Sequence, residues 1–275
     1  MLRFLSTNKK DARIIAGGTS LLPDIRSGKL SPSCLVDASH LSNLRYIKHQ
    51  KNRVRIGALT RIRELKDARL GKEGYKAFAR VAGNFGGTAI ANMATLGGNL
   101  SVASSTSDIL PVLLSIDANV LLKSSSGERE ISVQDFLLGA GKTDRRPEEL
   151  ITEINFQAPA QRKICLFRKI SKRNSMFLAV LSVAIFMGID ESAVIRRVGV
   201  AFNEIQPATP GRAKNVESAL AGKTLSEEVI EQAVDKLRLD KFVSPDSETP
   251  SEYWNIASRN LLREQLCLCA AEISR

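Results

Sequence analysis

Two glycine pairs, about eighty residues apart, are the residues of this chain best suited to holding a ligand. The first stands in Ile14-Ile15-Ala16-Gly17-Gly18-Thr19-Ser20-Leu21, the second in Ala94-Thr95-Leu96-Gly97-Gly98-Asn99. In both, an apolar lead-in runs into two glycines and a small polar residue. Successive amides freed of neighbouring Cβ atoms form a concave anion site that suits phosphate. Two such loops would hold the halves of one diphosphate, which indicates a dinucleotide cofactor.

Other nucleotide motifs fit less well. Either loop alone is also typical of an ordinary turn between a strand and a helix. There is no G-x-G-x-x-G motif after a strand, so a Rossmann nicotinamide site is unsupported. The segment Gly139-Ala140-Gly141-Lys142-Thr143 ends like a P-loop, but Phe136 stands where that motif requires its first glycine. We interpret this segment as a turn.

Composition sets limits on the class of protein. The chain has 275 residues, 43% hydrophobic and 25% charged, which is ordinary for a globular protein and gives room for two domains. Its longest apolar run, Met176 to Ile189, is shorter than the roughly 20 residues that a membrane helix needs. The N-terminus, Met1 to Lys10, lacks the apolar region of an export signal.

The cysteines show no metal-binding spacing. They are Cys34, Cys165, Cys267 and Cys269. None forms a C-x-x-C pair, and no nearby histidines complete a ligand set. Cys267 and Cys269 stand two apart in a predicted helix, which aims them in different directions. We therefore expect no metal or iron–sulfur cluster on this chain, and a reducing, cytoplasmic location.

The formal net charge is +11, and basic residues crowd one segment. They are Arg45, Lys48, Lys51, Arg53, Arg55, Arg61, Arg63 and Lys66. Three explanations remain open: a nucleic acid partner, an acidic protein partner, or a solvated surface. Nucleic acid is the least favoured, because only 5% of the chain is aromatic and few side chains are available to stack on bases.

Apolar patterning predicts a mixed N-terminal half. Short strands are predicted at 13–16, 35–37, 54–58, 118–123, 129–133 and 149–156, and helices at 60–67 and 75–81. Ile62, Leu65, Phe78 and Val81 are the predicted inward residues of those helices. The glycine-rich, weakly charged segment from Gly83 to Asn99 is typical of backbone that wraps a ligand.

The pattern changes near residue 160. Residues 159–163 are predicted to be a linker. Consecutive strands at 164–169, 177–187 and 194–202 favour an antiparallel sheet. A capping box at Thr224-Leu225-Ser226-Glu227 then predicts one helix, and Ser251 is a candidate cap for a last helix.

In their order and spacing, these segments resemble the FAD-binding medium subunits of the xanthine dehydrogenase and aerobic carbon monoxide dehydrogenase (molybdenum hydroxylase) family, over nearly the whole chain. The matching motifs are Ala16 to Ser20, Thr95 to Asn99, Asp108-Ile109-Leu110-Pro111, Gly139 to Thr143, Glu149 to Ile154 and Phe167 to Arg173. The resemblance implies an α+β fold. A two-part, PCMH-type FAD-binding domain would span 1–160, with subdomains of about 1–55 and 56–160. A C-terminal domain of antiparallel sheet plus helices would span 161–275.

The resemblance also implies roles for particular residues. Ile15, Ala16, Gly17, Gly18, Thr19, Ser20 and Leu21 would hold the FAD diphosphate together with Thr95, Leu96, Gly97, Gly98 and Asn99. Gly86 would lie against the cofactor, and Ile151 would pack against the flavin. Asp108 would accept hydrogen bonds from FAD hydroxyls, or else cap the helix that follows it. Lys169 would stabilise negative charge on the reduced flavin, or else be a solvated strand lysine.

Three positions depart from the family pattern. Relatives commonly have Gln-Ile-Arg-Asn where this chain has Ala89-Ile90-Ala91-Asn92. Ala94 replaces a frequent glycine, and Ser20 a frequent aspartate. Losing the arginine removes a rigid group of donors that could brace the loop or a phosphate.

The functional reading is therefore an electron-transfer subunit. Electrons would come from the [2Fe-2S] clusters of a small partner subunit and leave through FAD to NAD or another acceptor, while a large molybdenum-cofactor subunit oxidises the substrate. The alternatives are a flavin-free or weakly binding assembly subunit, a stand-alone flavin oxidoreductase and, last, a nucleic acid binder. The histidines, His40 and His49, lie close together in the basic segment, and we find no base for substrate chemistry.

Overall fold

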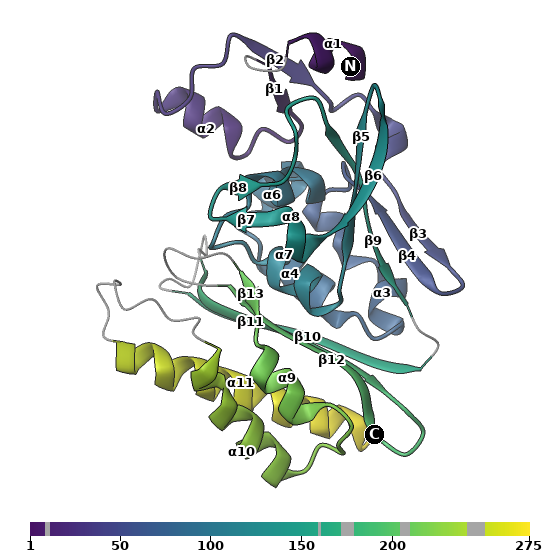
Figure 1. Cartoon of the computed structure of the whole chain (residues 1–275), viewed down its shortest axis with the longest axis vertical. Helices are drawn as coiled ribbons and strands as arrows, with labels where there is room; N and C mark the ends of the chain where they lie inside the picture. The colour runs from purple at the N-terminus through teal and green to yellow at the C-terminus, as the bar shows by residue number, and fades with distance from the viewer. Residues whose placement is uncertain (9–11, 159–160, 172–178, 204–209, 241–250) are drawn as a thin grey trace.

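The computed structural model describes residues 1–8, 12–158, 161–171, 179–203, 210–240 and 251–275. Within these ranges the strands form four sheets, and helices cover them (Figure 1). The molecule is elongated, with a small N-terminal unit at one end and a layer of three helices at the other. The α+β architecture predicted from the sequence is confirmed.

The small N-terminal unit carries the first glycine loop. Its elements are α1 (Leu2–Thr7), β1 (Ala12–Ile15), α2 (Leu21–Arg26) and β2 (Cys34–Asp37). Strands β1 and β2 pair in parallel, with Ile15 opposite Asp37. The loop between β1 and α2 therefore leaves the carboxyl end of β1, which is where backbone amides at the edge of a parallel sheet become available.

The middle unit is built on a five-stranded antiparallel sheet with the order β3-β4-β9-β5-β6. Its strands are β3 (Ile47–Gln50), β4 (Arg53–Gly57), β5 (Asn119–Ser124), β6 (Gly127–Ser132) and β9 (Leu150–Gln157). Strand β4 pairs with β9, with Ile56 opposite Ile154. The subdomain boundary expected near residue 55 therefore falls inside a strand of this sheet.

Short helices connect these strands and carry the second glycine loop. They are η1 (Ser42–Leu44), η2 (Ile62–Lys66), α3 (Ala68–Lys72), α4 (Lys76–Asn84), α5 (Thr88–Met93), α6 (Leu96–Val102), α7 (Ile109–Ser115) and α8 (Val133–Phe136). The helix predicted at 60–67 is a 3-10 helix. The segment predicted as a turn at 139–143 lies in the hairpin of β7 (Leu137–Gly139) and β8 (Lys142–Thr143).

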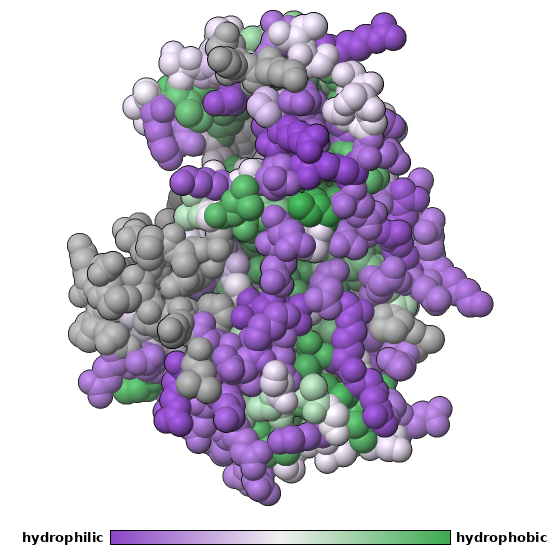
Figure 2. Space-filling model, viewed as in Figure 1, coloured by the Kyte–Doolittle hydropathy of each residue, from purple (hydrophilic) through white to green (hydrophobic). Residues whose placement is uncertain are grey.

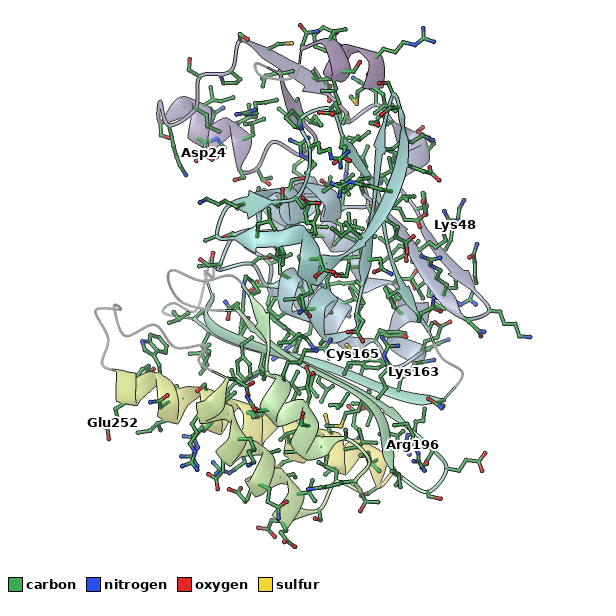
Figure 3. All side chains as sticks on the ribbon, in the orientation of Figure 1. Asp24, Lys48, Lys163, Cys165, Arg196 and Glu252 are labelled. Carbon is green, nitrogen blue, oxygen red and sulfur yellow. The ribbon has the colours of Figure 1, made fainter. Side chains whose placement is uncertain are left out.

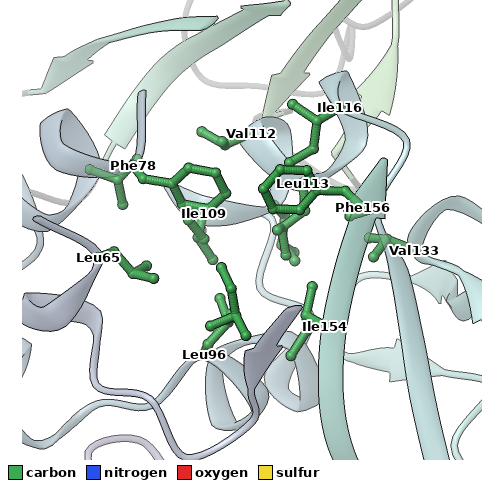
Figure 4. Packing of buried hydrophobic residues seen from close by; sticks show 14 of the residues in the cluster. Leu65, Phe78, Leu96, Ile109, Val112, Leu113, Ile116, Val133, Ile154 and Phe156 are labelled. Carbon is green, nitrogen blue, oxygen red and sulfur yellow. The ribbon is translucent and has the colours of Figure 1, made fainter. Parts of the chain in front are cut away.

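One apolar core joins the middle unit to one face of the C-terminal sheet. Leu65, Phe78, Leu96, Ile109 and Phe156 pack together in it (Figure 4). All four predicted inward helix residues, Ile62, Leu65, Phe78 and Val81, have no exposed surface. The same core contains residues of the C-terminal sheet, such as Phe186, which stacks on Tyr75 at a ring distance of 6.1 Å. The core thus fixes the two halves of the chain against each other.

The C-terminal sheet is antiparallel, as predicted, with the order β10-β11-β12-β13. Its strands are β10 (Arg162–Ser171), β11 (Ala179–Ile189), β12 (Ile195–Asn203) and β13 (Gly211–Arg212). Helices α9 (Lys214–Leu220), α10 (Glu227–Lys236) and α11 (Ser251–Ile273), with the short η3 (Leu237–Leu239), cover its outer face (Figure 1). A second core, which includes Trp254 and Leu262, lies between them. The sheet is therefore buried on both faces.

Two local predictions in this half need correction. Strand β10 begins at Arg162, so the last two residues of the predicted linker pair with β11, with Lys163 opposite Gly188. The capping box predicted from Thr224 is absent. Ser226 caps α10 by accepting a hydrogen bond from the Val229 amide at 3.3 Å, while Thr224 pairs with Val194.

The four cysteines are free thiols that differ in exposure. Cys267 is exposed and Cys269 is buried, so they do point apart. Cys165 on β10 is also buried (Figure 3). The face drawn in Figure 2 is mostly hydrophilic, with apolar residues in separate patches. Among the described residues no helix has the length and apolarity to cross a bilayer, and no group of side chains could hold a metal ion.

Candidate functional site

The first glycine loop lies directly against the backbone that enters the second. A Cβ added to Gly17 would stand 1.9 Å from the Met93 carbonyl oxygen and 3.1 Å from the Ala94 amide nitrogen. No side chain fits at that distance, so glycine is required for the approach. Gly18 has φ +69°, a left-handed conformation that also favours glycine. The two loops, distant in sequence, therefore form one site.

The amides of the first loop are available to a ligand. Within the described residues, the backbone N–H groups of Gly17, Gly18, Thr19 and Ser20 donate to no protein acceptor. The loop is partly exposed, and Thr19 is the most exposed of these four residues. Consecutive unpaired amides in a glycine-containing turn are the arrangement that binds an anion. That this loop holds the FAD diphosphate stays a prediction, and its amides are free to do so.

The second loop uses its amides differently from what we expected. The Leu96 amide donates to the Thr60 carbonyl at 2.9 Å, and the Gly97 amide to the Ala58 carbonyl at 2.8 Å. The Gly98 amide donates to the Thr95 hydroxyl at 3.1 Å. A Cβ on Gly97 would lie 2.7 Å from the Cβ of Ala58. Here the glycine pair serves close packing.

The second loop offers a ligand side-chain donors in place of free backbone amides. The Thr95 hydroxyl accepts from Gly98, and its own proton has no acceptor among the described residues. Asn99 Oδ1 accepts a hydrogen bond from the Ser107 hydroxyl at 2.6 Å, which leaves the Asn99 side-chain N–H groups without a partner in the described chain. The expected amide nest is thus replaced by one hydroxyl and one carboxamide.

Asp108 and Lys169 form a buried ion pair next to Ser107. Lys169 Nζ lies 2.5 Å from Asp108 Oδ2 and donates to the Asn84 carbonyl at 2.8 Å. Each of the two side chains is 6% exposed. Lys169 is therefore not a solvated strand lysine. Asp108 precedes α7, but its carboxylate makes no capping hydrogen bond, so the capping alternative is also wrong.

One oxygen of Asp108 is left without a donor. Asp108 Oδ1 is buried and has no hydrogen-bond partner in the described chain. Burial raises the pKa of Asp108 from 3.8 to about 6, although the nearby Lys169 ammonium opposes this. A buried carboxylate oxygen of this kind is costly unless a ligand donates to it.

Two predicted residues remain, Gly86 and Ile151. Gly86 lies near this ion pair, and Ile151 lies in the core. Gly86 has φ +53° and follows Asn84, whose carbonyl binds Lys169. Ile151 on β9 is 4% exposed and belongs to the main apolar core. Its side chain therefore packs inside the protein, and only its backbone remains for a ligand.

The positions that depart from the family pattern are small and enclosed. Ala91 and Ala94 are 6% and 5% exposed. Asn92 Oδ1 accepts from Arg63 at 2.9 Å. Ser20 precedes α2 without a side-chain capping bond.

The structure joins five of the predicted residues, from both loops and the ion pair, into one line of contacts. It runs from Gly17 through Ala94, Thr95, Asn99 and Ser107 to Asp108, Lys169 and Asn84. Sequence reasoning missed Ser107 and Asn84. Ser107 is a small polar residue beside a candidate aspartate, which was a usable signal. Asn84 contributes only its carbonyl oxygen, which has no sequence signature.

The fold and site together define a protein in which unpaired amides of the first glycine loop lie beside the second loop. The sequence matches the model of the FAD binding domain in molybdopterin dehydrogenase over residues 1–158. It also matches the model of the CO dehydrogenase flavoprotein C-terminal domain over residues 167–266. The chain therefore belongs to the family of FAD-binding medium subunits of molybdenum hydroxylases, and it is an oxidoreductase subunit of that family.

Named relatives agree with this assignment. The chain is 30% identical to the glyceraldehyde dehydrogenase medium chain of Sulfolobus acidocaldarius, with 92% of this chain and 88% of the relative covered. It is 27% identical to the carbon monoxide dehydrogenase medium chain of Hydrogenophaga pseudoflava, with 82% and 77% covered. The nicotinate dehydrogenase FAD-subunit of Eubacterium barkeri is 29% identical, with 79% and 74% covered.

Solved structures show the same fold at lower identity. Quinoline 2-oxidoreductase from Pseudomonas putida 86 superposes with a TM-score of 0.88 at 23% identity, covering 100% of this chain and 94% of that chain. Carbon monoxide dehydrogenase from Hydrogenophaga pseudoflava gives a TM-score of 0.87 at 23% identity, covering 96% and 91%.

Proposed function

We propose that this chain is the electron-transfer subunit of a molybdenum hydroxylase complex. Electrons would arrive from [2Fe-2S] clusters of a small partner subunit and leave through FAD to NAD or another acceptor, after a large molybdenum-cofactor subunit has oxidised the substrate. The observation that carries the proposal is the approach of Gly17 to Met93, which brings the unpaired amides of the first loop beside the second loop.

The residues of the site fit the cofactor. The amides of Gly17 to Ser20 would bind the diphosphate, and the Thr95 hydroxyl and Asn99 carboxamide would donate to it from the other side. Ile15, Ala16 and Leu21 would flank that contact, and Leu96, Gly97 and Gly98 would hold Thr95 and Asn99 in position. Their amides are bonded within the protein, so they would act through packing.

Asp108 and Lys169 would act at the sugar and flavin end. Asp108 Oδ1 is a buried acceptor that lacks a donor, and a cofactor hydroxyl would supply one. Lys169 would be held by Asp108 and by the Asn84 carbonyl with its positive charge towards the flavin, and Gly86 and the backbone of Ile151 would lie against it. Bound FAD takes up electrons singly and can release a pair as hydride.

The proposal includes the partners, the location and the division of the chain. Relatives are named as medium chains or subunits of dehydrogenases, which supports a hetero-oligomer. The free cysteines support a cytoplasmic location. We divide the chain into an FAD-binding domain of 1–160 and a C-terminal domain of 161–275. Because β3 pairs with β4 and β4 pairs with β9, we set the subdomain boundary before Ile47.

A second function is favoured by one observation. The amides of the second loop already donate hydrogen bonds to protein oxygens. A subunit that binds FAD weakly and serves in assembly would therefore need no change in that loop. Nucleic acid binding has no comparable support.

Flavin titration of the purified chain separates the two functions. We expect yellow protein with close to one FAD per chain, measured by absorbance after gel filtration and by quenching of flavin fluorescence. A colourless chain that takes up no added FAD would establish the assembly role instead. Reduction of the bound flavin by the complete complex with its substrate, compared with the isolated chain, tests the electron-transfer step separately.

A further inference from the structure

A basic groove lies on the outer side of the segment that leads into the second glycine loop. It encloses about 560 Å³ between η2, the end of α5 and the turn after η1. Its walls carry the cations Arg45, Arg61, Arg63 and Lys66, together with Met93. The Met93 carbonyl faces Gly17 of the first loop, and Met93 is also one of the residues that line the groove. The groove is thus adjacent to the cofactor site but is not part of it.

The acidic groups of the groove are already engaged. Glu64 accepts three hydrogen bonds from the Arg45 guanidinium, at 2.5, 3.0 and 3.0 Å, and one from the Arg61 amide at 2.8 Å. Asp67 Oδ1 accepts from two amides at the start of α3. Both carboxylates therefore accept hydrogen bonds from the backbone, and that of Glu64 also pairs with Arg45.

Two cations of the groove remain without an acidic partner among the described residues. No carboxylate there lies within ion-pair distance of Arg63 or Lys66; Arg63 donates only to the neutral Asn92 side chain. Arg61 differs, because its charge acts together with that of Arg45 on Glu64. Arg53 and Arg55 of the same segment are paired, Arg55 with Glu153 at 2.7 Å. The groove therefore holds part of the segment's uncompensated charge, beside an apolar rim that the rest of the segment does not have.

An apolar rim adjoins these cations. Ile90 and Met93 stand three residues apart on α5, on the same side of the helix, and are 38% and 50% exposed. Methionine and arginine are enriched at protein–protein interfaces, and charged pairs around an apolar contact fix partner and orientation. The groove thus combines a contact for apolar side chains with a contact for carboxylates.

We propose that this groove docks an acidic segment of a partner subunit. Carboxylates of that segment would pair with Arg63 and Lys66, and one apolar side chain would pack on Ile90 and Met93. A small anion fits less well, because Arg63 and Lys66 are exposed and salt would screen them, while the apolar rim would have no role. This inference rests on the proposed function, since it supplies a contact surface for the proposed complex.

Charge reversal in the groove tests the proposal. The complex is purified through a tag on this chain, its other subunits are separated, and their affinity for the FAD-loaded chain is measured by biolayer interferometry. We expect Arg63→Glu with Lys66→Glu to weaken binding by ~100-fold, because like charges would replace opposite ones. This variant should keep wild-type flavin content, which shows that the fold and the cofactor site are intact.

The matched control reverses the same amount of charge elsewhere. Lys236→Glu with Arg238→Glu changes two exposed residues at the end of α10 and in η3 and should leave affinity within about 3-fold of wild type. Equal binding by the groove variant, or an equal loss in the control, would overturn the proposal. Micromolar binding of inorganic pyrophosphate that is lost in the groove variant would also overturn it. If no other subunit accompanies the tagged wild-type chain, the proposed complex itself fails.

Discussion

The two glycine loops look alike in sequence and differ in what their backbone does. In the first, the amides from Gly17 to Ser20 have no acceptor within the described chain. In the second, Leu96, Gly97 and Gly98 donate to protein oxygens, and Gly97 leaves no room for a Cβ beside Ala58. The same residue pair therefore opens the backbone to a ligand in one loop and tightens packing in the other. A glycine motif identifies where the backbone closely approaches another group. It does not show whether that group is a ligand or another part of the protein.

The largest expected effect is at Gly17. In Gly17→Val, the new side chain would collide with the Met93 carbonyl, which lies 1.9 Å from an ideal Cβ, and would separate the loops. We expect FAD affinity to fall by more than ~100-fold, measured by fluorescence titration, because a displacement of about 1 Å in a positioned group costs that much. Gly71→Val, where a Cβ meets nothing within 4 Å, is the control. Normal FAD binding by Gly17→Val would mean that the loops need not touch.

Asp108 provides a test of the side-chain contacts, which lie on the same side of the site as the second loop. It thereby sharpens the comparison between the two loops. Its pKa of about 6, against an ordinary 3.8, means that the folded chain holds this proton more tightly than the unfolded chain. The contribution of this group to the free energy of unfolding is therefore fully present below pH 4. It falls by about 3 kcal/mol as the pH rises to about 6. We expect wild type to lose that amount relative to Asp108→Asn between pH 4 and pH 6.5 in urea unfolding without FAD. Parallel pH curves for the two proteins would contradict the assignment.

Gly97 should behave differently from Gly17. In Gly97→Ala the added methyl would press on Ala58, at 2.7 Å, inside the core. We expect a loss of about 2 kcal/mol in the free energy of unfolding, from overpacking, with FAD affinity much less affected than in Gly17→Val. Gly83→Ala, which meets only the end of the Lys66 side chain at 3.7 Å, should not destabilise the fold. If Gly97→Ala abolished FAD binding without loss of stability, the contrast between the loops would fail.

The smallest effect is expected at a helix cap. Thr95→Ala removes the acceptor for the Gly98 amide, and Ser226→Ala removes the equivalent acceptor in α10. Each should cost ~1 kcal/mol of stability in denaturant unfolding. Only Thr95→Ala should also weaken FAD binding, because only that hydroxyl faces the proposed site. Equal flavin affinity in the two variants would limit Thr95 to a capping role.

The sequence predicted what depends on local pattern. Alternating and helical apolar residues located most strands and the buried residues of η2 and α4, such as Leu65 and Phe78. The prediction failed where a tertiary partner decided the outcome. Thr224 pairs with Val194 instead of capping α10, and the amides of the second loop bond to Ala58 and Thr60. No local signal distinguishes an open amide from an engaged one.

The site could be predicted only in part for the same reason. Matching motifs placed Asp108 and Lys169 near one cofactor, but not in contact with each other. Their ion pair depends on how α7 and β10 pack, which is set by the shared core. The unpartnered Asp108 Oδ1 follows from that geometry and could not be derived from residue types.

The first loop belongs to the N-terminal unit, which buries few apolar side chains. Before residue 53, the buried apolar side chains are Leu5, Ala12 and Ala38 among the described residues, and neither main core includes any of them. Units with so little buried apolar surface open at lower free energy than the rest of a protein. On warming, amide exchange should therefore quicken first in β1 and β2, and flavin should be released while the larger cores still resist melting. Thermal inactivation would then begin as cofactor loss, and added FAD would protect against it.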